Sequence, residues 1–428
     1  MLLGVLFRHR IKTMLDSSSD RLVYLYAINA KKRNTMKQAK LLRQFFFWLV
    51  IPMLSLTSMG CETLKSVCGG HCGAPKAPEC GDGSTTLFSE FPVDLDALNV
   101  VEPLGHVAPP GHTFPSDHIY LILNKNEDGS IPEVPITIPA KINSLRISEK
   151  KYYDIETGDI TQMDYSINFD PCEDYSSYFL HVNTISAEIL AMEKKEEDNS
   201  SYDTFDSHIE VKDWAVHETF AAGTPLGTIN NPWATFDWGA FDRRDSSQIQ
   251  EQLLSPALDQ SFEDYRYTVC PIHELPEEIR TQVVYGVEGQ VMEDLECGTI
   301  FQNKPGTLKG VWFKADMFDV AEEPHIAFLH NNINPDEQMV SIGNTLAPAA
   351  PSATTFVPQS ASHINRHFEE VTPGETVYCY PLVQWSDATK ILVQMPSEKE
   401  ILAQGFTSGE CGDNEEIDPQ AAVSFIRL

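Results

Sequence analysis

The strongest constraint on the fold is a pattern of short apolar runs that begins at Leu87. The runs are rich in Val, Ile, Tyr and Phe, and turn residues separate them. Runs of this length and composition are typical of β-strands. In the clearest case, LRISEKKYYDI and ITQMDYSINFD flank the turn ETGD, where Gly158 can adopt a positive φ. The sequence therefore predicts a mainly β fold.

The rest of the pattern suggests how the chain is divided. A length of 428 residues exceeds what one hydrophobic core usually organises. A polar stretch after Arg244 predicts a linker, and further strands are expected at GTLKGVWFKA, HIAFLH, TVYCYPLVQW and KILVQMP. One helix is expected at 185–197, because Ile185, Ile189 and Met192 recur at helical spacing. We expect a β domain at 87–245, a linker at 246–264 and a β-rich C-terminal domain at 265–428.

The N-terminal part carries a targeting pattern. Basic residues precede the apolar run FFFWLVIPMLSL, and small residues then lead to Cys61. This order is typical of a secretory signal peptide, and the run is shorter than the roughly 20 residues of a transmembrane helix. The stretch LTSMGC resembles a bacterial lipobox, although Ser58 stands where leucine is usual. The resemblance implies that Cys61 carries lipid such as palmitate, and Glu62 after it favours the outer membrane.

These features set the expected N-terminal boundaries. Met36 is the expected start, which makes 1–35 an over-extended N-terminus, 36–60 the signal peptide and 61–86 a Cys/Gly/Pro-rich tether. Residues 1–60 hold ten Lys plus Arg and two Asp, so the net charge of −31 becomes −39 without them. So acidic a surface argues against nucleic-acid partners. The only membrane contact expected is through the N-terminal lipid.

The cysteines predict disulfides. There are nine, and eight remain once Cys61 is set aside for lipid. An exported location permits disulfides, but eight cysteines allow 105 pairings, so their connectivity stays open. In CGGHCGAPKAPECG a histidine stands among three cysteines, as in a zinc knuckle. The Gly and Pro content favours a disulfide-stapled tether instead.

A histidine-rich loop precedes the first long apolar run. It reads PLGHVAPPGHTFPSDH and ends at His118. From this loop to Arg244, the order of features resembles the lysostaphin-type zinc metalloendopeptidases, which cut cell-wall peptide cross-links on a small two-sheet β fold. The matching stretches, in order, are GHTFPSDHIYLIL, EVPITIPAKINSLRI, SSYFLHVNTIS, AAGTPLGTI and FDWGAFD. The implied fold is a small two-sheet β domain of the peptidoglycan-endopeptidase type, followed by a second β-rich domain.

The resemblance implies a set of site residues. His112 and Asp117 match the first two metal ligands, but they lie five residues apart instead of four. Thr235 and Asp237 occupy the places of the two histidines of the His-x-His motif. The implied metal ligands are therefore His112, Asp117 and Asp237, with His181 as general acid and base. Zinc accepts such a set, and its carboxylates also suit manganese or magnesium.

Simpler interpretations of the same residues remain open. Strand alternation would place Phe179 and His181 on one face and Tyr178, Leu180 and Val182 on the other, which makes His181 an ordinary surface residue. Asp237 could stabilise a hairpin turn. His118 follows Asp117 directly and is an outside candidate.

Two functions follow from these alternatives. The first is an exported cell-envelope lipoprotein with a degenerate, non-catalytic domain that binds peptidoglycan or another envelope or extracellular ligand, or serves a structural role. The second is an active metalloendopeptidase with one divalent metal as its cofactor. Thr235 cannot act as a base near neutral pH, which favours the first.

Overall fold

The computed structural model describes most of the chain after residue 75. The described ranges are 76–81, 86–109, 111–203, 207–244, 265–292, 295–317, 322–346, 351–382, 390–412 and 414–427. The predicted signal peptide, Cys61 and the linker 246–264 lie outside them. The chain separates into Met1–Cys72 and Gly73–Leu428, and all described residues belong to the second unit. Within the described residues, no helix has the length and apolar character needed to cross a membrane.

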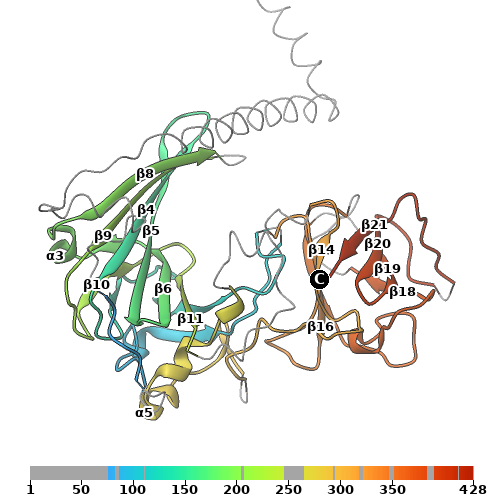
Figure 1. The fold of residues 1–428 in the computed structure, drawn as a ribbon, viewed down its shortest axis with the longest axis horizontal. Coiled ribbons are helices and arrows are strands. Elements are labelled where there is room, and N and C mark those ends of the chain that lie inside the picture. Colours follow the sequence, from blue (N-terminus) through green and yellow to red (C-terminus); the bar gives the residue numbers. More distant parts are fainter. Residues whose placement is uncertain are drawn as a thin grey trace, which may run out of the picture. The chain divides into compact units, whose positions relative to one another are not determined.

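The predicted mainly β fold is confirmed. An eight-stranded antiparallel sheet, here the N-terminal sheet, has the strand order β1-β2-β11-β6-β5-β4-β9-β8 (Figure 1). Its strands are β1 (Leu98–Glu102), β2 (His118–Leu123), β4 (Leu145–Asp154), β5 (Ile160–Cys172), β6 (Tyr175–Val182), β8 (Lys195–Asp203), β9 (Ser207–Val216) and β11 (Thr235–Asp242). A small sheet has the order β3-β10-β7, formed by β3 (Val134–Thr137), β10 (Pro225–Ile229) and β7 (Thr184–Ile185).

Alternation along the central strands builds the core between these two sheets. On β11, Phe236 and Trp238 are fully buried, and both rings pack against Phe179 of β6 at centroid distances of 5.6 and 6.0 Å. The residue between them, Asp237, faces the opposite side of the sheet, because successive side chains of a strand alternate. This geometry makes one face of β11 apolar and leaves the other for polar side chains.

The predicted β4–β5 hairpin is confirmed. The two strands pair antiparallel, and Gly158 in the turn has a φ of 74°. The Asp154 carboxylate accepts the backbone N–H groups of Glu156 and Thr157, which fixes the turn. The hairpin continues into a long ribbon with β9 and β8 (Figure 1).

The predicted helix at 185–197 is wrong beyond its first turn. Helix α3 covers only Ala187–Leu190, capped by Ser186. From Lys195 the chain forms β8, whose residues pair with β9. Ladder hydrogen bonds to β9 satisfy the backbone of this polar segment, so strand pairing replaces the predicted helix from Lys195 onward.

A second eight-stranded antiparallel sheet, here the C-terminal sheet, follows. Its order is β17-β16-β15-β14-β21-β20-β19-β18. The strands are β14 (Gly310–Lys314), β15 (Ile326–His330), β16 (Gln338–Ile342), β17 (Ser352–Phe356), β18 (Val377–Pro381), β19 (Lys390–Ser397), β20 (Glu400–Phe406) and β21 (Val423–Ile426). All four strands predicted from the sequence in this half are present. Apolar side chains on one face of this sheet, among them Trp312, Phe328 and Tyr380, form a core cluster of their own. Val311, Phe313, Ala327 and Leu329 of β14 and β15 belong instead to the cluster that contains the core of the N-terminal sheet.

Residues 265–300 pack on the N-terminal sheet, although the sequence suggested that they begin the C-terminal domain. They comprise η5 (Tyr265–Tyr267), η6 (Pro271–Glu274), α5 (Glu277–Arg280), β12 (Gly286–Val287) and β13 (Gln290–Val291). The Val269 N–H donates to the Ala240 carbonyl at 3.0 Å, and the Val101 N–H donates to the Val284 carbonyl at 2.8 Å. Several of their side chains belong to the core cluster of the N-terminal sheet.

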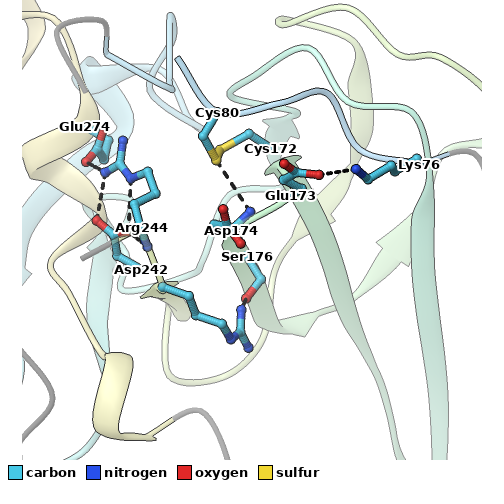
Figure 2. The surroundings of a disulfide bond; sticks show 10 residues. Lys76, Cys80, Cys172, Glu173, Asp174, Ser176, Asp242, Arg244 and Glu274 are labelled. Carbon is cyan, nitrogen blue, oxygen red and sulfur yellow. Dashed lines mark hydrogen bonds and ion pairs between the residues drawn. A yellow bond between two sulfur atoms is a disulfide. The ribbon is translucent and has the colours of Figure 1, made fainter. Parts of the chain in front are cut away.

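The prediction of disulfides is confirmed. The described cysteines pair as Cys80–Cys172, Cys270–Cys297 and Cys379–Cys411. Cys68 and Cys72 lie outside the described residues. Figure 2 shows the first pair, which joins the end of the predicted tether to the end of β5, with an ion pair between Lys76 and Glu173 beside it.

Candidate functional site

The histidine-rich loop folds back on itself before β2. Ala108 and His112 exchange backbone hydrogen bonds at 2.9 and 3.1 Å, and the Ser116 N–H donates to the His106 carbonyl at 2.9 Å. His106 itself contacts the Glu102 carboxylate, at the edge of the loop. These contacts hold the described residues of the loop where Asp117 and His118 meet the start of β2.

Strand register brings Asp237 next to His118. In the β2–β11 ladder, Asp237 pairs with Tyr120 and Gly239 pairs with His118. His118 and Tyr120 share a face of β2, with ring centroids 4.9 Å apart. The alternate side chains of both strands thus gather on the polar face of the N-terminal sheet.

His118 lies between two carboxylates at the centre of this group. Its Nδ1 is 3.0 Å from Oδ1 of Asp117, and its Nε2 is 3.3 Å from Oδ2 of Asp237. The residue is 3% exposed. Burial disfavours its charged form, but Asp237 and Asp117 outweigh burial and raise the pKa of His118. Burial also raises the pKa of Asp237, although His118 and His181 oppose it.

Tyr178 supports this arrangement from β6. Its hydroxyl donates to Oδ1 of Asp117 at 2.8 Å. Its ring passes over Gly239 of β11, where a Cβ atom would lie 2.1 Å from the Tyr178 Cζ. Burial would raise the pKa of Asp117, but its hydrogen bonds to His118 and Tyr178 prevail and lower it.

A bulge in β6 turns His181 toward the same group. Between the pairs Tyr165–Val182 and Ile167–Phe179, β5 advances two residues and β6 advances three. His181 has a φ of 63°, in the left-handed region. The predicted alternation therefore holds only as far as Leu180. The extra residue places His181 on the polar face, opposite to Phe179, and not on the face that it shares in a regular strand.

Two carboxylates also flank His181. Its Nδ1 is 2.8 Å from Oδ2 of Asp164, and its Nε2 is 3.5 Å from Oδ2 of Asp237. Burial would lower the pKa of His181, but Asp164 and Asp237 raise it. Asp237 is thus shared by two imidazoles, each held on its far side by another aspartate.

The structure gathers the predicted site residues in one region but does not bring the predicted metal ligands to one point. The imidazole of His118 stands between Asp117 and Asp237, and its two nitrogens point away from each other. The two carboxylates therefore cannot meet at one ion. The His112 ring centroid is 5.5 Å from that of His118. Burial and the neighbouring His118 charge lower the pKa of His112 to about 4.

Buried polar atoms that lack a hydrogen-bond partner indicate whether these residues could hold a metal ion. Nδ1 of His112, Nε2 of His118 and Oδ1 of Asp237 are buried without a hydrogen-bond partner. They are nitrogen and oxygen donors that divalent metals accept. However, no three His, Cys, Asp or Glu side chains in the described ranges stand close enough together to hold an ion. The donor atoms are of a kind that binds metals, but the side chains would have to move closer together to hold an ion.

Sequence reasoning missed Asp164 and Tyr178 and ranked His118 below Asp117. The position of Asp164 opposite His181 depends on the β6 bulge, which left no signal in the sequence that could be recognised. Thr235, which occupies the place that the resemblance assigns to a histidine, has a buried Oγ1 without a hydrogen-bond partner.

A pocket opens beside His181. Its volume is about 170 Å³. It lies between the start of β5 and the turn from β10 to β11, and its lining includes Thr161, Gln162, Asp164, His181, Asn183 and Trp233. The polar face thus continues from the buried group around His118 to a solvent-facing hollow.

No family model, curated protein or solved structure matches this chain.

Proposed function

We propose that the protein is an exported, lipid-anchored cell-envelope protein whose N-terminal sheet binds peptidoglycan without cutting it. The observation that carries this proposal is the setting of His118. Both of its nitrogens face carboxylates, and the ring is buried. A hydrolytic site of the kind that the sequence resembles needs an ion with an open position and a base near the attacking water. Here the centre of the site is filled by the buried imidazole of His118, held between two carboxylates.

Other features of the polar face agree with binding. Thr235 stands where the resemblance expects a histidine, and a threonine hydroxyl donates hydrogen bonds but does not accept a proton near neutral pH. His181 reaches the pocket, where a ligand has access. The envelope location rests on the LTSMGC pattern and the signal-like apolar run before it.

The three unsatisfied buried atoms support a second candidate, a metalloendopeptidase. In this candidate His112, His118 and Asp237 would hold a divalent metal, which supplies a Lewis acid and an activated water. Asp117 would then lie behind His118 and fix its tautomer, as carboxylates commonly do for metal-binding histidines. His181, oriented by Asp164, would move the proton.

One experiment separates the two candidates. The full-length protein, purified in detergent, is incubated with insoluble peptidoglycan after exposure to zinc or manganese, and bound protein, released fragments and metal content are measured. Binding without released fragments supports the proposal. Fragments that depend on added metal would overturn it.

Two variants make the result specific. Asp237→Asn removes the carboxylate shared by both imidazoles, and Glu133→Gln makes the same chemical change at an exposed residue. Digestion that disappears in Asp237→Asn and persists in Glu133→Gln would establish the endopeptidase. Absence of peptidoglycan binding by the unmodified protein would refute the binding function.

A further inference from the structure

We infer that the pocket beside His181 binds a neutral saccharide ring, with the Trp233 indole as its stacking platform. This inference rests on the proposed binding function and names the part of the polymer that is recognised. It depends on the exposure of Trp233, on the rigidity of its turn, and on the size and polarity of the pocket.

Trp233 is an unusually exposed aromatic residue for this chain. It is 53% exposed, whereas Trp214, Trp238 and Trp312 are buried. Its ring centroid lies 6.2 Å from that of His181, at an angle of 62°. An indole offers a large flat apolar face together with an N–H donor. One exposed hydrophobic residue needs no explanation by itself, but this one lines a pocket.

The turn that carries Trp233 is held rigidly. The buried Asn231 accepts the Trp233 N–H through Oδ1 at 3.2 Å, and its Nδ2 donates to the carbonyls of Thr235 and His181. The next residue, Ala234, is fully buried with a φ of 54°. Left-handed backbone costs free energy in a residue other than glycine and often occurs at functional sites. His181 on the opposite wall shares this conformation.

The pocket has the size of one sugar ring. Its volume of about 170 Å³ is below the roughly 300–1,000 Å³ of pockets that enclose drug-sized ligands. A pocket of this size can hold one ring of a longer glycan. The lining combines apolar surface from Met163, Pro232 and the Trp233 indole with hydroxyl and amide groups from Thr161, Gln162 and Asn183. A saccharide ring presents an apolar C–H face and a rim of hydroxyl groups, which matches this lining.

Charge disfavours an anionic ligand. Asp164 lines the pocket, and Asp237 lies behind His181. The chain as a whole carries a net charge of −31. Anionic polymers would meet a repulsive field, whereas the glycan chain of an envelope polymer would not.

The test uses oligomers of N-acetylglucosamine, which lack stem peptides, as the probe. Calorimetric titration of the full-length protein in detergent measures binding of the oligomers and, separately, of a free stem peptide. Trp233→Ala should weaken oligomer binding about tenfold or more, because exposed tryptophan anchors carry a large share of binding energy. Trp233→Phe keeps a stacking face and should retain most of the affinity.

Tyr202→Ala is the matched control, because Tyr202 is a similarly exposed aromatic residue on the edge strand β8, outside the pocket. The Tyr202→Ala variant should bind the oligomers with the affinity of the unmodified protein. Binding of intact peptidoglycan without binding of the oligomers, or equal oligomer binding by Trp233→Ala, would overturn the saccharide inference and leave the proposed function standing. Binding of the stem peptide alone would do the same. Failure to bind intact peptidoglycan would refute the proposed function itself.

Discussion

The missing side chain of Gly239 shapes the centre of the polar face. The Tyr178 ring occupies the space where a Cβ atom would stand, and its hydroxyl thereby reaches Asp117. Gly239→Ala should displace this ring and break the hydrogen bond. We expect a loss of about 1–3 kcal/mol in the free energy of unfolding, as for other overpacked sites, measured by chemical denaturation.

Gly374→Ala serves as the control for this prediction. A Cβ atom there would meet no atom outside the adjacent residues closer than 4.0 Å, and the φ of Gly374 is not positive. The free energy of unfolding of the Gly374→Ala variant should differ little from that of the unmodified protein. Equal stability of Gly239→Ala and the unmodified protein would show that the ring can move without loss.

The candidate site was only partly predictable from single residues. The order of motifs pointed to His181 and Asp237, and the structure places them 3.5 Å apart. The pairing of Asp117 with His118 depends on how the loop enters β2. The contact between Asp164 and His181 depends on the register between strands, which the sequence does not specify on its own.

Among the elements, the bulge in β6 decides the composition of the polar face. His181 has a φ of 63°, which glycine adopts freely and a β-branched residue resists. We expect His181→Val to be less stable than His181→Gly by about 1–3 kcal/mol, in free energies of unfolding from urea titrations. Both variants lose the contact with Asp164. The difference between their free energies of unfolding therefore reports the cost of the left-handed backbone at this position.

The same pair of substitutions at Ser176 of β6 provides a comparison at a residue of the same strand whose φ is not positive. Valine should be preferred there, because it favours strands. A His181→Val variant as stable as His181→Gly would mean that the bulge moves or disappears.

Secondary structure was predictable where the local residue pattern favours the same element that the strand pairing stabilises. The hairpin of β4 and β5 combines strand-forming residues with a turn that contains Gly158, and the structure has it as expected. The segment 185–197 has apolar residues at helical spacing, but only Ala187–Leu190 are helical, and from Lys195 the chain pairs as an edge strand with β9. The pairing of this polar stretch with the strand that follows it is not visible in the spacing of its apolar residues, so the strand β8 was missed.

At the scale of the whole described unit, the loop before β2 is joined to the start of β15. The Phe114 N–H donates to Oε2 of Glu322 at 2.9 Å, across 208 residues of sequence. The Phe114 ring stacks on His325 at 5.4 Å and an angle of 11°. Glu322 is 5% exposed. No motif in the sequence indicated this contact, because it joins two segments with no shared pattern.

This contact predicts a dependence of stability on pH. Burial raises the pKa of Glu322 from 4.5 to about 8, against the opposing hydrogen bonds from the loop backbone. Between these two values the folded protein keeps a proton that the unfolded chain releases. The contribution of Glu322 to stability should therefore decrease as pH rises through this window and level off above it.

Glu322→Gln removes the titration while keeping the shape of the side chain. Urea midpoints measured from about pH 5 to about pH 9 should fall less steeply for this variant than for the unmodified protein. Glu133→Gln, an exposed change of the same kind, should leave the slope as it was. Parallel curves for Glu322→Gln and the unmodified protein would exclude this role.

The Cys80–Cys172 bond has a mechanical consequence. Tension on the N-terminal end of the chain passes through Cys80 directly to the end of β5, which pairs with a strand on each side. Residues 81–171 then form a covalently closed loop that carries no load, so β1 at the sheet edge is spared from being peeled away. The force would instead act on an interior strand, which is hydrogen-bonded to β4 on one side and to β6 on the other. Reduction of this one bond would reroute the force to the edge and lower the load at which the sheet opens.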